Sequence, residues 1–379
     1  MHGRQRLLVE SSSRFFDRQS FAKGLHGPSL TRTISYPQGD LRVSQQPAAV
    51  VVELTDDCNA TCRTCIAGSF EGAGNYKSLD QLGASLKVAL EGVDVPPVVF
   101  ISGGEPTIHP DFEGVIELAY GLGVGHVVLI TNGKRIAEEP QLAKHLKYSF
   151  PDLEVFLQFD AIDREVLLEI RGIDLSETRR AASERLSDAG VYTTFVSVVK
   201  EGRSLELIGS TVEYATSLPY VRGVNFQPLR ASGRHGEGGI VAGTAPTIGG
   251  MIRALSTQLP FVSRDSIAPH PLAPGSIAIG HWDRVEAGAL SVSTVQPSGL
   301  LIPPPSGSAD VFRIMVVNYI DKYNLRSDLV EEAPIFVATD SGEVLPLDLY
   351  YLLGIPPVGA VPVHINRRPR SDQQAGTRV

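Results

Sequence analysis

The stretch AAVVVELTDDCNATCRTC, which runs from Ala48 to Cys65, joins a short apolar run to a cluster of thiols. Residues 48–54 are apolar and β-branched apart from Glu53, which is typical of a buried strand. The thiols follow in a C-x3-C-x2-C spacing and are the only 3 cysteines among 379 residues. Because an odd number of clustered cysteines cannot build a disulfide framework, we predict reactive or metal-bound thiols just after a strand.

The same alternation of apolar runs and helical segments continues to about residue 230. Strand candidates occupy residues 48–54, 97–102, 126–131, 153–159, 192–199 and 221–227. Helical periodicity falls between them, at residues 78–91, 111–122, 138–147, 163–188 and 205–217. This spacing predicts an α/β fold of βα units around a parallel sheet, in which functional residues follow the carboxyl ends of strands.

Composition divides the chain into four regions. We expect an N-terminal extension at residues 1–47, the βα units at 48–235, an α+β region that caps the sheet and holds the substrate at 236–365, and a disordered polar tail at 366–379. Within the third region we expect helices at 247–258 and 310–322, a loop-dominated stretch at 263–308 and a strand-turn-strand at 335–348. Asp340, Ser341 and Gly342 would supply its turn.

The overall charge and hydropathy narrow the class of partner. The formal charge is −8 and the pI about 5.6, so the bulk composition does not predict a nucleic-acid partner. The chain has no apolar run of the roughly 18 residues that a membrane helix needs, and its first residues lack the apolar core of a secretory signal. We expect a cytoplasmic protein with a small-molecule partner and no transmembrane segment.

The three thiols, Cys58, Cys62 and Cys65, allow more than one kind of site. Three thiolates can bind three irons of a [4Fe-4S] cluster and leave the fourth iron open to a small molecule, whereas electron-carrying clusters normally have four cysteine ligands. A three-cysteine zinc site completed by histidine, or plain structural thiols, are the alternatives. The nearest histidines, His26 and His109, belong to no paired-cysteine knuckle. The pattern favours the cluster.

A second motif follows the second strand. The segment ISGGEPTIHP (101–110) contains Gly103, Gly104 and Glu105. Together with C-x3-C-x2-C one βα unit earlier, it resembles the signature of the radical S-adenosylmethionine (SAM) superfamily. The resemblance implies a partial (βα)6 barrel over about 48–230, with a [4Fe-4S] cluster and SAM as cofactors. It also implies that the GGE segment binds the amino group of SAM, and that SAM cleavage gives a 5'-deoxyadenosyl radical that abstracts substrate hydrogen.

Polar residues follow the remaining strands and form a predicted ring at the barrel mouth. Asn132 and its neighbour Thr131 are expected to reach the ribose or carboxylate of SAM, although a simple Asn-Gly turn is the alternative. Gln158 and Asp160 point to one side by the two-residue strand period. The predicted cofactor-binding residues are Gly103, Gly104, Glu105, Thr131, Asn132, Gln158, Asp160, Ser197 and Gln227, and the ring also includes Lys200 and Arg230.

Two residues are predicted to be catalytic. A carboxylate at the end of a buried strand is costly unless it is used, so we predict a catalytic role for Asp160, with an N-cap of the next helix as the alternative. Arg234, which follows the sixth strand, is the second predicted catalytic residue.

A narrower resemblance rests on LQFDAIDREVLLEIRG, VRGVNFQPLRASGR and YIDKYNLRSDLV. These segments are similar to the subgroup that contains tetraether lipid synthase and the dihydropterin C-methylating enzyme. The auxiliary cysteines of that subgroup are missing here, so we expect no auxiliary metal.

With every cysteine committed to iron, no thiol remains to donate hydrogen. We therefore expect a redox-neutral rearrangement or elimination, or carbon-carbon bond formation, on a small-molecule or lipid-like substrate. A flavodoxin or ferredoxin-type electron donor would be the protein partner. The alternatives are an iron-sulfur electron carrier or sensor without SAM chemistry, and a scaffold that has lost catalysis.

Overall fold

A computed structural model provides the three-dimensional view of the chain. It describes residues 32–36, 39–43, 47–91, 93, 97–234, 245–285, 290–293, 302, 304–305, 310–321, 323–340 and 344–353. The predicted tail at 366–379 and most of the predicted extension at 1–47 lie outside these residues. In the extension, β1 (Arg32–Tyr36) and β2 (Gly39–Val43) form an antiparallel pair.

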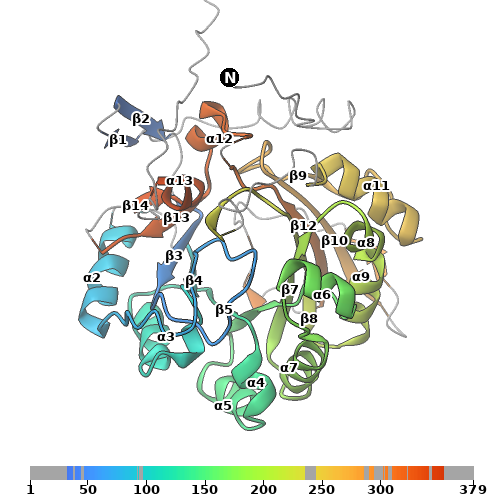
Figure 1. Cartoon of the computed structure of the whole chain (residues 1–379), viewed down its shortest axis with the longest axis horizontal. Helices are drawn as coiled ribbons and strands as arrows, with labels where there is room; N and C mark the ends of the chain where they lie inside the picture. The colour runs from blue at the N-terminus through green and yellow to red at the C-terminus, as the bar shows by residue number, and fades with distance from the viewer. Residues whose placement is uncertain are drawn as a thin grey trace, which may run out of the picture.

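The six predicted strands are confirmed, each to within two residues. They are β3 (Ala49–Glu53), β4 (Val98–Ser102), β5 (Val127–Thr131), β6 (Glu154–Gln158), β7 (Tyr192–Val199) and β8 (Val221–Pro228). Each pairs in parallel with the next along the chain. The carboxyl ends of all six therefore meet at one edge, and helices cover the outer face (Figure 1).

The helices follow the predicted positions but are more divided. They are α2 (Leu79–Leu90), the 3-10 turn η1 (Pro106–Ile108), α3 (Phe112–Gly121), α4 (Lys134–Glu138), α5 (Leu142–Ser149), α6 (Arg164–Ile170), α7 (Ser176–Asp188), α8 (Arg203–Glu206) and α9 (Ile208–Ser217). The single helix predicted at 163–188 is broken because Gly172 adopts a φ of 81° after α6. The Asp174 carboxylate then accepts a 3.0 Å bond from the Ser176 amide, at the start of α7.

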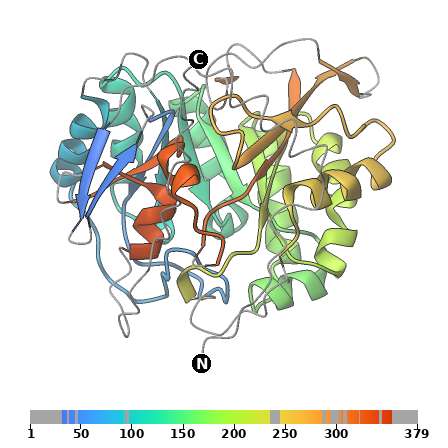
Figure 2. The ribbon, with the colours of Figure 1, turned by 90° about the horizontal axis from the view of Figure 1, so that it is seen from above.

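The C-terminal region contains both helices and strands, as predicted, and it extends the sheet at both edges. On one side β12 (Val311–Val317) lies parallel to β8, followed by antiparallel β10 (Ile277–Arg284), β11 (Leu290–Val292) and the short β9 (Ala268–Pro269). On the other side β13 (Ile335–Ala338) lies parallel to β3 and antiparallel to β14 (Val344–Pro346). Figure 2 shows the red segments beside the blue strands and the orange strands beside the green ones.

Two predictions for this region are wrong. The helix expected at 310–322 is strand β12, which pairs with β8 and β10 along its two edges and packs against core side chains on both faces. The stretch expected to be loop-dominated at 263–308 contains the eight-residue strand β10. The predicted helix at 247–258 is confirmed as α11 (Ile248–Gln258), and α12 (Ser327–Glu331) and α13 (Leu347–Leu353) complete the described helices. The strand-turn-strand is confirmed, although Ser341 and Gly342 lie outside the described residues.

The sheet is a partial barrel with a filled floor. Among the described residues the sheet has 12 strands; β9 pairs with β10 off the main path, and the others run in a hydrogen-bonded order from β11 to β14 without closing. At the amino end of β6, the buried Glu154 carboxylate accepts hydrogen bonds from Thr194 (2.6 Å), Arg222 (3.1 Å) and Arg313 and lies 3.0 Å from His126 Nε2. Burial opposes its ionisation, but the charges of the two arginines prevail and lower the pKa of Glu154. This ionic cluster fills the barrel below the functional residues.

Candidate functional site

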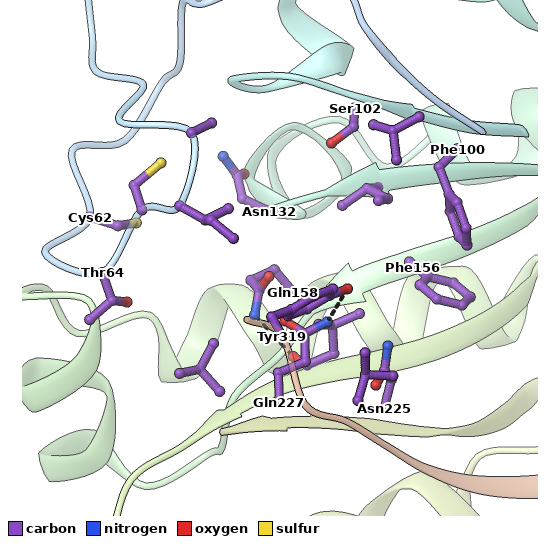
Figure 3. Close-up of a pocket in the computed structure, with 18 of the residues that line it drawn as sticks. Cys62, Thr64, Phe100, Ser102, Asn132, Phe156, Gln158, Asn225, Gln227 and Tyr319 are labelled. Carbon is purple, nitrogen blue, oxygen red and sulfur yellow. Dashed lines mark hydrogen bonds between the residues drawn. The ribbon is translucent and has the colours of Figure 1, made fainter. Parts of the chain in front are cut away.

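One cavity of about 240 Å³ opens at the carboxyl ends of the strands and continues into the barrel. Its lining includes all three cysteines and, among the predicted cofactor-binding residues, Gly103, Gly104, Glu105, Thr131, Asn132, Gln158 and Gln227. Figure 3 shows Cys62 and Thr64 at one end and Phe100, Phe156 and Asn225 at the other. The fold therefore brings the two sequence motifs together in one place.

The two glycines of the second motif are needed for close packing against the first. A Cβ on Gly103 would lie 2.6 Å from the carbonyl oxygen of Thr55, and one on Gly104 would lie 1.9 Å from that of Asp57. The Gly104 amide donates to the Thr55 carbonyl (2.7 Å), and the Glu105 amide donates to the Asp57 carbonyl (2.9 Å). The GGE segment thus fixes the chain that leads into Cys58, in addition to lining the cavity.

Glu105 is buried and connects two strand ends. Its Oε1 accepts hydrogen bonds from the Thr107 hydroxyl and the Thr131 hydroxyl, both at 2.6 Å, and its Oε2 accepts from the Asn132 amide at 2.7 Å. Burial raises the pKa of Glu105, and these donors oppose that rise. Because Oε2 accepts from the Asn132 amide alone among the described residues, it keeps acceptor capacity for a ligand in the cavity.

The segment after β5 holds the cysteine loop from a second side. Asn132 Nδ2 donates to Asn59 Oδ1 at 2.7 Å and lies 3.9 Å from Cys58 Sγ, and Lys134 Nζ donates to the Asn59 carbonyl at 2.6 Å. Gly133 has a φ of 77°, so the Asn-Gly turn considered as an alternative is also present. Asn132 therefore belongs to a turn and to the cavity wall at once.

Two more segments clasp the cysteine loop. The Arg63 amide donates to the Arg171 carbonyl at 3.2 Å. The Arg234 guanidinium donates to the carbonyls of Gly68 (2.9 Å), Ser69 (2.6 Å) and Cys62. A Cβ on Gly233, whose φ is 56°, would lie 2.1 Å from the Cys65 carbonyl oxygen. The ends of two segments that carry the narrower resemblance, Arg171 and Gly233–Arg234, therefore contact the cysteine loop.

Arg234 does not take the place expected of a catalytic residue. It is absent from the cavity lining, and its side chain is occupied by three carbonyl groups of the loop. The geometry assigns it the positioning of the cysteines.

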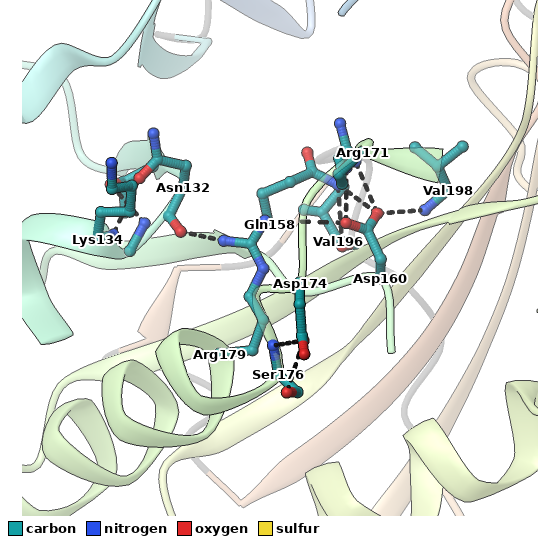
Figure 4. A network of polar contacts seen from close by, with 12 residues as sticks. Asn132, Lys134, Gln158, Asp160, Arg171, Asp174, Ser176, Arg179, Val196 and Val198 are labelled. Carbon is teal, nitrogen blue, oxygen red and sulfur yellow. Dashed lines mark hydrogen bonds and ion pairs between the residues drawn. The ribbon is translucent and has the colours of Figure 1, made fainter. Parts of the chain in front are cut away.

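Asp160, the other predicted catalytic residue, is buried and is not among the residues that line the cavity. Its carboxylate forms a two-point ion pair with Arg171 (2.6 and 2.7 Å) and accepts from Gln158 Nε2 (3.0 Å) and the Val198 amide (3.1 Å), as Figure 4 shows. Burial opposes its ionisation, but Arg171 lowers the pKa of Asp160. The alternative, in which Asp160 is the N-cap of the next helix, is wrong, because Asp163 caps α6 through a 3.0 Å bond from the Val166 amide.

Two arginines in the cavity wall were not predicted as site residues. Arg171 and Arg179 both line the cavity, and Asp160 lies 2.6 Å from the first and 3.8 Å from the second. Burial lowers the pKa of Arg179 to about 10, which still leaves it charged at neutral pH. Two cations share the Asp160 carboxylate, so their guanidinium groups keep donor capacity for an anionic group of a ligand. The buried position of Arg179 in the polar segment SETRRAASERLSD gave no sequence signal.

Of the remaining residues in the predicted ring, some line the cavity and others do not. Gln227 lines the cavity, and its Nε2 lies 3.5 Å from the Tyr319 hydroxyl. Ser197 is buried outside the lining, because the two-residue strand period brings its neighbours Val196 and Val198 to the wall instead. Lys200 forms an ion pair with Glu169. Tyr319 and Tyr351 line the cavity from the C-terminal region and were not predicted.

The thiols suit a cluster that attaches to three cysteines. Burial raises the pKa of Cys58 to about 12 and also raises that of Cys65, so iron must displace protons when it binds. Within the part of the chain that the structure describes, no three Cys, His, Asp or Glu side chains gather closely enough to hold a single metal ion. The same part of the chain has no helix long and apolar enough to cross a membrane.

Comparisons with known proteins agree with this arrangement. The radical SAM superfamily model matches residues 52–215. A 7,8-dihydro-6-hydroxymethylpterin dimethyltransferase of Methanocaldococcus jannaschii is 27% identical over 233 residues, covering 60% of this chain and 46% of the relative. The mycofactocin maturase MftC of Mycolicibacterium smegmatis is 29% identical over 191 residues, covering 50% and 46%. The chain thus spans about half the length of the curated relatives it matches.

A solved structure, that of SuiB from Streptococcus suis, is 13% identical with a TM-score of 0.49, covering 84% of this chain and 64% of SuiB. The superfamily match coincides with β3 to α9 and includes the cysteine loop, the GGE segment and both cavity arginines. The cofactors of this superfamily are SAM and an iron-sulfur cluster, and the residues lining the cavity fit both. Residues 52–215 therefore form a radical SAM domain.

Proposed function

We propose that the chain is a radical SAM enzyme that acts on a small molecule. The supporting observation is the shared cavity, in which three thiols, the GGE segment and two arginines meet above an apolar barrel interior. When bound there, the cluster and SAM would supply the radical chemistry, in which a 5'-deoxyadenosyl radical abstracts hydrogen from a substrate carbon.

The residues of the chain divide the work of binding. Cys58, Cys62 and Cys65 would each bind one iron, which leaves the fourth iron for SAM. Arg171 and Arg179, with Gln158 beside them, would hold the SAM carboxylate, since the only carboxylate they share is Asp160 within the described residues. Glu105 Oε2 would accept from the SAM ammonium group. The apolar walls below would exclude water from the reacting carbon.

The outcome after hydrogen abstraction is part of the proposal. No cysteine remains beyond the three in the loop, so a redox-neutral rearrangement or elimination, or carbon-carbon bond formation, is favoured over thiol-dependent hydrogen donation. The relatives include a dihydropterin dimethyltransferase and a maturase, and both names support a role in biosynthesis. A cytoplasmic location and a flavodoxin or ferredoxin-type electron donor complete the proposal.

Anaerobic reconstitution tests it. The protein is loaded with iron and sulfide, reduced with dithionite, given SAM and assayed for 5'-deoxyadenosine by chromatography. We expect the nucleoside to form in the wild type and to be absent in Cys62→Ala. If the wild type forms no more nucleoside than Cys62→Ala and its cluster spectrum ignores added SAM, the alternative of an electron carrier or sensor replaces this proposal.

A further inference from the structure

The inner half of the cavity differs chemically from its mouth. Two residues below the mouth on each strand, the inward side chains form an apolar layer that includes Val51, Phe100, Phe156, Val196 and Met315. One member of this layer is polar. Asn225 lies level with Val196 on β7 and with Met315 on β12, and its side chain lines the cavity among them.

The side-chain amide of Asn225 has a buried oxygen without a hydrogen-bond partner among the described residues. The residue is 3% exposed, and the unpaired atom is Oδ1. Buried polar groups are nearly always paired, and leaving one unpaired costs about 1–3 kcal/mol. An apolar side chain of the same shape would fill this position at no such cost. The unpaired amide therefore points to a ligand that completes it.

The neighbouring levels of the barrel do not supply that partner. One level below, Gly223 leaves room for Arg313, because a Cβ there would lie 2.6 Å from Arg313 Cγ. Arg313 Nη2 donates to Glu154 and Thr194, and neither its Nη1 nor its Nε donates to Asn225 Oδ1. One level above, Gln227 contacts the Tyr319 hydroxyl. Asn225 also lies at the end of the cavity opposite Cys62 (Figure 3), away from the cofactor.

We propose that Asn225 is a substrate-recognition residue and that the barrel interior takes a compact, uncharged molecule with an apolar body and one amide-like group. The ligand N–H donates to Asn225 Oδ1, and the ligand carbonyl accepts from Nδ2. This rests on the proposed function, because the cavity is taken to be the substrate site of that enzyme. A charged group is disfavoured, since the layer offers it no counterion and burying it unpaired is costly. The whole cavity measures about 240 Å³ and its mouth is assigned to the cofactors, so the inner half suits only a compact ligand.

Three probes of similar shape test the recognition: benzamide, benzoate and toluene. Each is titrated under anaerobic conditions into the reconstituted protein with SAM, and binding is followed by ligand-observed NMR. We expect benzamide to bind more tightly than benzoate. In Asn225→Leu, benzamide should bind about tenfold more weakly, while toluene binds equally well or better. Met315→Leu, which changes the neighbouring apolar residue, should leave the preference for benzamide intact.

A second measurement separates recognition from a structural role. Without probe, Asn225→Leu should keep its iron content and SAM binding, and its melting temperature should stay unchanged or rise, because an unpaired polar group has been removed. Unchanged benzamide binding in Asn225→Leu, tighter binding of benzoate, no binding of benzamide to the wild type, or a fall in melting temperature overturns the inference. Failure to form 5'-deoxyadenosine instead counts against the proposed function alone.

Discussion

The two ends of strand β6 carry buried carboxylates that look alike and serve different purposes. Glu154 begins the strand, Asp160 follows it, and each is ion-paired with arginine and has a lowered pKa. The arginines of Glu154 are absent from the cavity lining, whereas both arginines near Asp160 line it. Burial and a perturbed pKa alone therefore do not mark a functional residue. The two carboxylates differ in whether the arginine partner lines the cavity and can still donate hydrogen bonds to a ligand.

The largest effect is expected on stability, at the amino end of β6, where Glu154 lies in the barrel floor. Glu154→Gln leaves Arg222 and Arg313 without their carboxylate in the barrel floor, so we expect the free energy of unfolding to fall by about 3–5 kcal/mol. Denaturant titration of the protein without cofactors measures this. The fraction that remains folded should bind SAM with unchanged affinity. A variant as stable as the wild type would show that the ionic floor is not structural.

The matched change after the carboxyl end of β6, at Asp160, should lower the affinity for SAM instead. Asp160→Asn releases Arg171 from its two-point ion pair, and we expect SAM affinity to fall about tenfold while iron content is retained. Stability should fall less than in Glu154→Gln, because Arg171 and Arg179 can be hydrated in the cavity. Equilibrium dialysis with labelled SAM measures the affinity. Unchanged SAM binding would show that Asp160 does not position Arg171 for SAM.

The cysteine loop gives a third comparison, between a clasping arginine and a surface one. Arg234→Ala removes bonds to three loop carbonyls, so we expect slower cluster reconstitution and about half the iron content or less. Arg203, which is exposed and pairs with Asp163, provides the control Arg203→Ala, whose iron content should match the wild type. Equal iron content in both variants would show that the clasp is dispensable.

The smallest effect concerns pH. The pKa of Asp160 is lowered in the folded protein, so its ion pair contributes above the unfolded carboxyl value of about 3.9 and is lost only as pH falls through the lower folded value. Between pH 5.5 and 8, SAM affinity should therefore depend on pH in the same way in the wild type and in Asp160→Asn. A step in that range that the variant lacks would mean that Asp160 is protonated near neutral pH.

The sequence predicted the barrel strands well because strands buried on both faces are continuous apolar runs. The same reasoning failed for residues 311–317, since a short apolar run beside helical segments fits a buried helix equally well. The strand at Ile277–Arg284 was hidden among prolines and glycines. Its place was decided by pairing with β12, which depends on tertiary contacts that no local pattern records.

For the site, residues placed directly after strands were predicted and those placed by tertiary partners were not. The cysteines, the GGE segment, Asn132 and Gln158 line the cavity because the ends of parallel strands meet there. Arg179 comes from a helix with a polar sequence, and its burial follows from how α7 packs. Asp160 was expected at the mouth because its partner Arg171 could not be located from the sequence.

The central claim is that SAM meets an open iron of a cluster held by the cysteine loop. Electron paramagnetic resonance of the dithionite-reduced, reconstituted protein, recorded with and without SAM, tests it most directly. We expect a [4Fe-4S] signal in the wild type whose g-values change when SAM is added. A four-iron signal that SAM leaves unchanged, or no such signal, would contradict the account.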